Sequence, residues 1–184
     1  IKSQIVIKRV FIILSIALLS FKANAQMVAV KSDVIKDIAM IPNLGLEMVV
    51  GNKATIGFDA FLAYKSWGKD VKIAGADANY KYWFNGRPFT RQYIGAAIQF
   101  SNHQIVWNKD RHYGNALAAG MIFGHVINLS TRFNIELSSG LMFMGYREKR
   151  YKEGDPYELY PGKVNNTGFL LVPKLEVSVS YILR

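Results

Sequence analysis

The chain has no cysteine among its 184 residues and only five prolines. Without thiols, a disulfide framework and every thiolate metal site are excluded, so stability must come from hydrogen-bonded secondary structure and burial. Long apolar runs are also missing after residue 25, where no stretch approaches the roughly 18 apolar residues of a membrane-spanning helix. These absences exclude a helical membrane protein and a small disulfide scaffold, and they leave one domain stabilised by its own packing.

The start of the chain has the pattern of a signal peptide. A basic beginning is followed by an apolar stretch at 10–21 and by Ala-Asn-Ala at 23–25, which supplies the small residues of a cleavage site. We therefore expect residues 1–25 to be removed and residues 26–184 to form the exported domain; the alternative is a buried N-terminal helix. The leader carries four basic residues and no acid, so its removal lowers the formal net charge from +10 to +6.

Beyond the leader, apolar and polar residues alternate in segments separated by turn residues. In the last segment Leu175, Val177 and Val179 fall on one parity, and Glu176 and Ser178 on the other. Such alternation is typical of a β-strand with two different faces. The segments expected to be strands are 27–36, 43–50, 54–64, 74–84, 92–100, 116–126, 132–146 and 173–184.

The connections between these segments differ in length at the two ends of the strands. Those at 51–53, 85–91 and 128–131 are short, whereas those at 101–115 and 147–170 are long. Short periplasmic turns and longer extracellular loops are typical of outer-membrane barrels, whose strands need about 9–11 residues to cross the bilayer. The pattern predicts an all-β fold: an eight-stranded antiparallel transmembrane β-barrel with up-and-down meander topology. The alternative is a soluble all-β domain with its apolar parity in a core.

Several segments together resemble a known family. "VAVKSDVI", "PNLGLEMVVGNKATI", "NYKYWFNGRPF", "YIGAAIQF" and "RFNIELSSGLMFMGYREKRY" occur in the order seen in a Bacteroidetes family of small outer-membrane barrels, catalogued as a domain of unknown function. The family is similar in architecture to the eight-stranded OmpA and OmpX barrels. The resemblance implies fold and location, but it supplies no activity and no catalytic residues.

The polar parity of the strands gathers most of the acidic residues. We expect these side chains to point into the lumen as a network of ion pairs, because buried charges must be paired to be tolerated. The alternative is acid–base chemistry by paired carboxylates. The expected lumen network is Lys31, Asp33, Glu47, Asp59, Asp77, Lys81, Glu136, Lys174 and Glu176.

The histidines give the weakest catalytic signal. His103 and His112 fall in the expected loop 101–115, where they could form part of a site at the outer rim, but no metal-ligand or Ser–His–Asp spacing accompanies them. We therefore expect solvated loop histidines, and no catalytic residue, metal or cofactor is predicted.

Aromatic residues concentrate near the strand ends, as expected for rings at two membrane–water interfaces. The expected girdle is Tyr64, Trp67, Tyr82, Phe84, Phe100, Phe143 and Tyr181, with Trp83, Phe89 and Tyr93 also placed at the periplasmic interface. Stacking on nucleic acid is the alternative use of aromatic and basic residues, and export argues against it.

The expected outer loops are basic. They could attract the phosphates of lipopolysaccharide, or their charges could simply be solvated. The residues concerned are Lys69, Lys72, Lys109, Arg111, Arg147, Lys149 and Arg150.

The leading functional hypothesis is a non-enzymatic integral outer-membrane barrel with a structural or interaction role. It would contact lipopolysaccharide and outer-membrane lipid, or serve as an accessory subunit of an outer-membrane or fimbrial assembly. The alternatives are an outer-membrane enzyme with its site at the extracellular rim and a small-ligand-binding barrel. A porin is not expected, since the interior of an eight-stranded barrel holds side chains rather than a channel.

Overall fold

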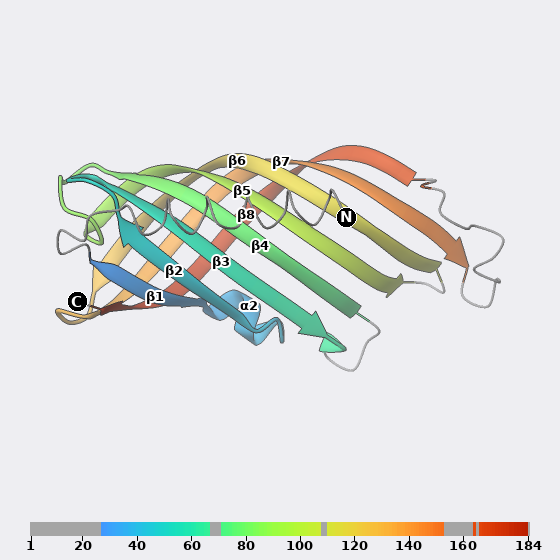
Figure 1. Ribbon diagram of the computed structural model, residues 1–184, viewed down its shortest axis with the longest axis horizontal. Helices are drawn as coiled ribbons and strands as arrows, with labels where there is room; N and C mark the ends of the chain where they lie inside the picture. Colours follow the sequence, from blue (N-terminus) through green and yellow to red (C-terminus); the bar gives the residue numbers. More distant parts are fainter. Residues whose placement is uncertain (1–26, 67–70, 108–109, 153–163, 165, 184) are drawn as a thin grey trace, which may run out of the picture.

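The computed structural model describes residues 27–66, 71–107, 110–152, 164 and 166–183. Within this part of the chain, eight strands follow one another in chain order around a closed ring (Figure 1). They are β1 (Val28–Asp33), β2 (Asn43–Val49), β3 (Ala54–Tyr64), β4 (Val71–Trp83), β5 (Arg91–Trp107), β6 (Asp110–Asn128), β7 (Phe133–Lys152) and β8 (Asn166–Leu183). One short helix, α2 (Val34–Ile38), follows β1. The predicted leader lies outside the described residues.

Each strand pairs antiparallel with the next strand of the chain. The ring closes where β1 pairs with β8, with Val28 opposite Leu183 and Asp33 opposite Ser178. The predicted eight-stranded antiparallel meander barrel is therefore confirmed. Among the described residues, no helix has the length and apolar character needed to cross a membrane.

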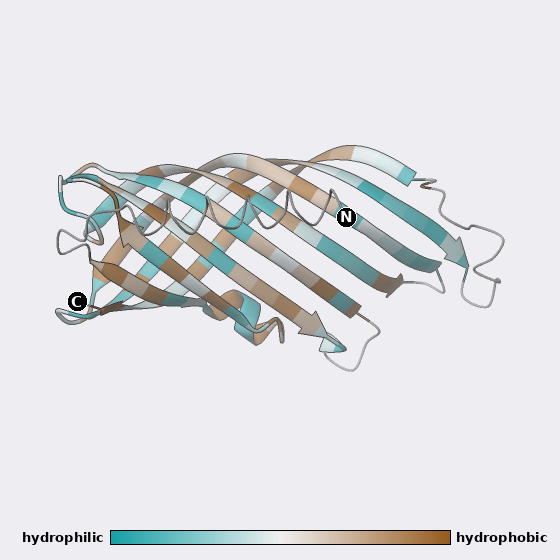
Figure 2. Cartoon of the chain, viewed as in Figure 1, coloured by the Kyte–Doolittle hydropathy of each residue, from teal (hydrophilic) through white to brown (hydrophobic). Residues whose placement is uncertain are grey.

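The wall of the barrel separates the two parities of each strand. On β7, Asn134, Glu136 and Ser138 are buried, whereas Leu137 and Leu141 are exposed. Figure 2 shows the same alternation of apolar and polar residues along the other strands. Contacts between strands that are not neighbours, such as β4 and β7, join polar side chains, so the polar parity faces the interior and the apolar parity faces outward.

The first strand is shorter than predicted because a helix interrupts it. The expected strand 27–36 ends at Asp33, whose carboxylate accepts a hydrogen bond from the Ile35 backbone N–H at 3.0 Å and caps α2. The Asn43 side chain accepts a further bond from the Asp33 backbone N–H at 2.6 Å. A short acidic side chain at this position favours a helix start over continuation of the strand.

The later strands, in contrast to β1, are longer than predicted. Most of 101–115 and the beginning and end of 147–170, expected as loops, are paired strand: β5 runs to Trp107, β6 starts at Asp110, and β7 continues to Lys152. These stretches are polar and were therefore expected to be loops. Beyond the apolar belt, however, the outer face of a barrel strand need not be apolar. The wall is consequently tall along β5–β8 and low along β1–β2 (Figure 1).

We name the two ends of the barrel by their connections. The turn end carries the turns at 50–53, 84–90 and 129–132, close to the predicted positions. The loop end carries the connections after β3, β5 and β7, parts of which lie outside the described residues.

Candidate functional site: the barrel interior and its loop end

Lys81 lies in the barrel interior and is almost completely buried. Its ammonium lies 2.7 Å from Glu47 Oε2 and 2.6 Å from Glu136 Oε1, so one cation bridges β2, β4 and β7. Thr55 donates to Glu47 at 2.6 Å, and the Tyr93 hydroxyl donates to Glu136. Both carboxylates thus have additional hydrogen bonds, as buried charges require.

A second group of ion pairs continues from the first toward the loop end. Lys31 Nζ lies 3.4 Å from both Glu176 Oε1 and Asp59 Oδ2, and 3.9 Å from Glu47 Oε2. Lys174 contacts Asp77 and lies 4.0 Å from Glu176. These contacts link Lys31, Glu47, Asp59, Asp77, Lys81, Glu136, Lys174 and Glu176 into one continuous cluster.

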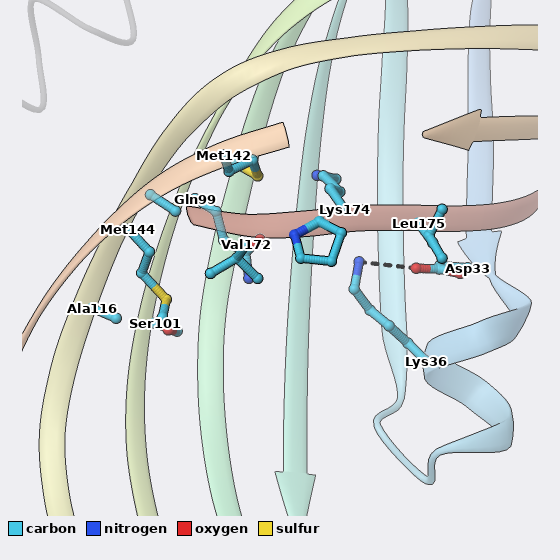
Figure 3. Close-up of a pocket in the computed structure, with 12 residues that line it drawn as sticks. Asp33, Lys36, Gln99, Ser101, Ala116, Met142, Met144, Val172, Lys174 and Leu175 are labelled. Atoms are coloured by element: carbon cyan, nitrogen blue, oxygen red, sulfur yellow. Dashed lines mark ion pairs between the residues drawn. The ribbon is translucent and has the colours of Figure 1, made fainter. Parts of the chain in front are cut away.

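The remaining member of the expected lumen set, Asp33, lies apart from this cluster. It caps α2 and pairs with Lys36 at 3.2 Å (Figure 3). Each of the three lysines lies within 4.0 Å of at least two carboxylates, as a packed ion-pair network requires. Among the described residues, four buried side-chain N or O atoms have no hydrogen-bond partner: Asp77 Oδ1, Asn79 Oδ1, Asn134 Nδ2 and Ser178 Oγ.

An aromatic cluster fills the interior at the turn end. Trp83, Phe89 and Tyr93 are buried. The ring centroid of Trp83 lies 5.9 Å from that of Phe89 and 4.9 Å from that of Tyr93. The expectation that these three rings lie at the periplasmic interface is wrong. Trp83 and Lys81 share a parity, so strict alternation along β4 would have placed this ring inside; the preference of aromatic residues for interfaces obscured that signal.

The other predicted girdle residues that the structure describes are on the outer face. Tyr82, Phe84, Tyr64, Phe100 and Phe143 are exposed. Tyr181 packs against Phe133 with centroids 4.9 Å apart, and its hydroxyl accepts a hydrogen bond from Arg132 at 3.1 Å. Trp67 lies outside the described residues.

At the loop end the two expected loop histidines meet one carboxylate. Both lie on paired strands, His103 on β5 and His112 on β6, and the expectation of solvated loop histidines is wrong. Glu148 of β7 lies 3.2 Å from His103 Nε2 and 3.1 Å from His112 Nδ1, and accepts a hydrogen bond from Asn166 at 2.5 Å. The three residues meet because β5, β6 and β7 are paired in this register, and their spacing in the sequence does not indicate it.

The surroundings of Glu148 favour its ionised form. Partial burial opposes ionisation of Glu148, but the hydrogen bonds with His112, His103 and Asn166 outweigh it and hold the pKa of this carboxyl below its usual value. No group of three or more ligand residues that could hold a metal ion occurs in the part of the chain that the structure describes.

Of the basic residues expected in loops, those that the structure describes lie at the loop end, on the strand extensions. Lys72 and Arg147 are exposed, and the Lys72 ammonium lies 5.1 Å from the Tyr64 ring centroid. Arg150 pairs with Asp110 at 2.7 Å. Arg111 and Lys149 are half-buried and make contacts of their own. Lys69 and Lys109 lie outside the described residues.

Toward the loop end the interior is hollow. A cavity of about 510 Å³ has walls that include Phe61, Ile73 and Ile105. A second cavity of about 250 Å³ adjoins it (Figure 3). The residues lining both are Lys36, Gln99, Ser101, Ala116 and Met144.

Comparison with known proteins gives a family but no activity. No curated protein matches the chain. Among solved structures, the crystal structure of Neisserial surface protein A (NspA) is similar with a TM-score of 0.45 and 13% identity, over 85% of this chain and 94% of that one. The family described as "Protein of unknown function (DUF3575)" matches residues 10–183, nearly the whole chain. The resemblance seen in the sequence is therefore confirmed, and the chain belongs to this family of proteins of unknown function.

Proposed function

We propose that the protein is an integral outer-membrane β-barrel with a structural or interaction role and no catalytic activity. The observation that carries the proposal is the apolar outer face of a closed barrel. Exposed residues on this face include Leu46, Phe58, Ile98, Leu117, Met121, Phe123, Leu141, Phe143, Leu171 and Leu175, from six of the eight strands. A soluble monomer rarely exposes a contiguous apolar surface of this extent, whereas lipid is a suitable surrounding for it.

Closure of the barrel supports the same location. A strand in the bilayer must have its backbone N–H and C=O groups paired, and the ring of antiparallel strands provides these pairs along most of the described wall, the free edge of β8 at Asn166–Val177 excepted. The interior in turn supports a role without conduction. The cluster around Lys81 and the rings of Trp83, Phe89 and Tyr93 occupy the lumen toward the turn end, so we expect no stable ion conductance in planar bilayers.

The location is tested by fractionation and gel migration. The protein should be recovered in the outer-membrane fraction and should migrate differently on a gel before and after boiling, because a folded barrel resists unfolding by the gel detergent. Recovery in the soluble periplasmic fraction would defeat the proposal. Export by removal of residues 1–25 belongs to the same proposal, and N-terminal sequencing of the membrane form should start at Gln26.

The loop end is the part we propose to contact lipopolysaccharide. Lys72 and Arg147 are exposed there, and cations at this height would meet the phosphates of the outer leaflet. Lipopolysaccharide that co-purifies with the barrel should decrease in the double variant K72E/R147E. It should stay unchanged in K53E, which reverses an exposed charge at the turn end. Equal retention in both variants, or recovery of a stoichiometric protein partner instead of lipid, would favour the accessory-subunit alternative.

A further inference from the structure

The barrel wall has an incomplete stretch beside β8. The pairing of β1 with β8 covers only Val28–Asp33 and Ser178–Leu183. Over Asn166–Val177, β8 pairs with β7 but with no second strand among the described residues. The helix α2 lies against β8 in place of a continued β1. We call this free edge of β8, together with α2, the β8 seam.

The seam is closed only loosely. α2 has no buried residue, and its Ile35 and Ile38 side chains are exposed. Polar side chains anchor it: Asp37 accepts hydrogen bonds from Ser32 at 2.7 Å and from Asn43 at 2.9 Å. Pro173 lies on the free edge of β8, a position that suits a residue without a backbone N–H.

The smaller cavity extends to this seam. Pro173 and Leu175 have the parity of the outward-facing residues of β8, and Leu175 is well exposed. Both nevertheless line the cavity, as does Lys174, which faces inward (Figure 3). Asp33 and Lys36, at the start of α2, line the same cavity, so it extends from the inner face of β8 to the β8 seam. Among the described residues, no further strand separates the interior from the outer face there.

The lining of the two cavities has the character of a site for a slender amphiphile. Phe61, Ile73 and Ile105 give the larger cavity apolar walls, and its volume of about 510 Å³ lies in the usual range for small-molecule sites. Gln99 and Ser101 line both cavities, and their side chains have no hydrogen-bond partner among the described residues.

The charged side chains that line the cavities already have ion-pair or hydrogen-bond partners. Lys36 pairs with Asp33 at 3.2 Å, Lys174 contacts Asp77, and Glu148 lies between two histidines. A charged ligand would have to displace one of these partners, and a neutral head group would not.

We propose that the loop-end half of the lumen binds a single-chain lipid with an uncharged hydrogen-bonding head group. The chain lies between the apolar walls, the head group bonds to Gln99 and Ser101, and the ligand enters from the bilayer through the β8 seam. The entry route rests on the membrane position proposed above, whereas the binding site itself does not.

The binding site is tested by filling it. Ala116 is buried and lines both cavities, while Ala119, on the same strand, is exposed on the outer face. The barrels A116W and A119W carry the same substitution on opposite faces. Native mass spectrometry of the barrel with the glycerol monoester of dodecanoic acid should show a 1:1 adduct for the wild type and A119W, and its loss for A116W.

Gel migration before and after boiling confirms folding in each variant, so a failure to form a membrane barrel is distinguished from a failure to bind. A folded wild type without the adduct, or equal adducts in all three barrels, would overturn the proposal. Free dodecanoate tests the head group: tighter binding of the acid than of the ester would contradict the assignment of an uncharged head.

The entry route is tested with a second matched pair. Leu175 lines the cavity at the seam, while Leu117 is exposed on the outer face of β6, away from the seam. Loading of the monoester from vesicles should be slower for L175W than for L117W. Equal loading rates would rule out the seam as the route.

Discussion

Replacing Lys81 by methionine tests the interior most sharply, because this single side chain holds two buried carboxylates. Lys81 lies 2.7 Å from Glu47 and 2.6 Å from Glu136, and all three are buried. Met has a similar length and no charge, so K81M leaves both acids without their main partner. Removing one partner of a buried ion pair costs about 3–5 kcal/mol. With a urea dependence of about 1–3 kcal/mol per molar, the unfolding midpoint should fall by at least about 1 M.

The assay is urea unfolding of the barrel refolded in lipid vesicles, followed by tryptophan fluorescence. The control is K53M, which removes an exposed lysine at the turn end and should change the unfolding free energy by no more than about 0.5 kcal/mol. The triple variant K81M/E47Q/E136Q removes the stranded charges and should recover most of the loss. If K81M unfolds at the same urea concentration as K53M, the ion-pair cluster is not holding the barrel together.

Three further results follow from single contacts. Trp83→Ala removes the central ring of the turn-end cluster and should destabilise the barrel by about 3–5 kcal/mol in the same urea assay. Gly124→Ala would place its Cβ 2.4 Å from the Tyr93 ring and should cost about 1–3 kcal/mol, but much less in a Y93L background; an equal cost in both backgrounds would refute the contact. Because the pKa of Glu148 is lowered in the folded state, its contribution to stability is present above the ordinary value of 4.5 and is lost as the pH falls below it. Hydrogen exchange should therefore show loss of protection at the loop end of β6 and β7 in acid, and E148Q should abolish that dependence.

The architecture could be predicted from the sequence because alternation is a local signal. The terminal segment shows this: Leu175 and Val179 are exposed on the outer face, and Glu176 and Ser178 are buried. Parity alone assigns these faces once a barrel is assumed. The ends of strands were predicted less well, since the side-chain hydrogen bond at Asp33 decides where β1 stops.

The sites depended on contacts between distant strands, which one sequence does not reveal. His103 and Glu148 are 45 positions apart and meet only because β5, β6 and β7 are adjacent and in register. The cavities likewise bring together side chains from distant parts of the chain, such as Phe61, Ile105 and Leu170. Trp83 is the exception, as its parity indicated burial but its residue type favoured an interface.

The most direct test of the account is which face of the wall meets lipid. The chain has no cysteine, so single cysteines can be placed along β7 and labelled with a nitroxide without removing native thiols. In reconstituted vesicles, labels at 137, 141 and 143 should be accessible to oxygen dissolved in the bilayer and shielded from a water-soluble nickel complex. Labels at 138 and 142 should be shielded from the lipid. High nickel accessibility at 137, 141 and 143 would contradict the membrane position of the barrel.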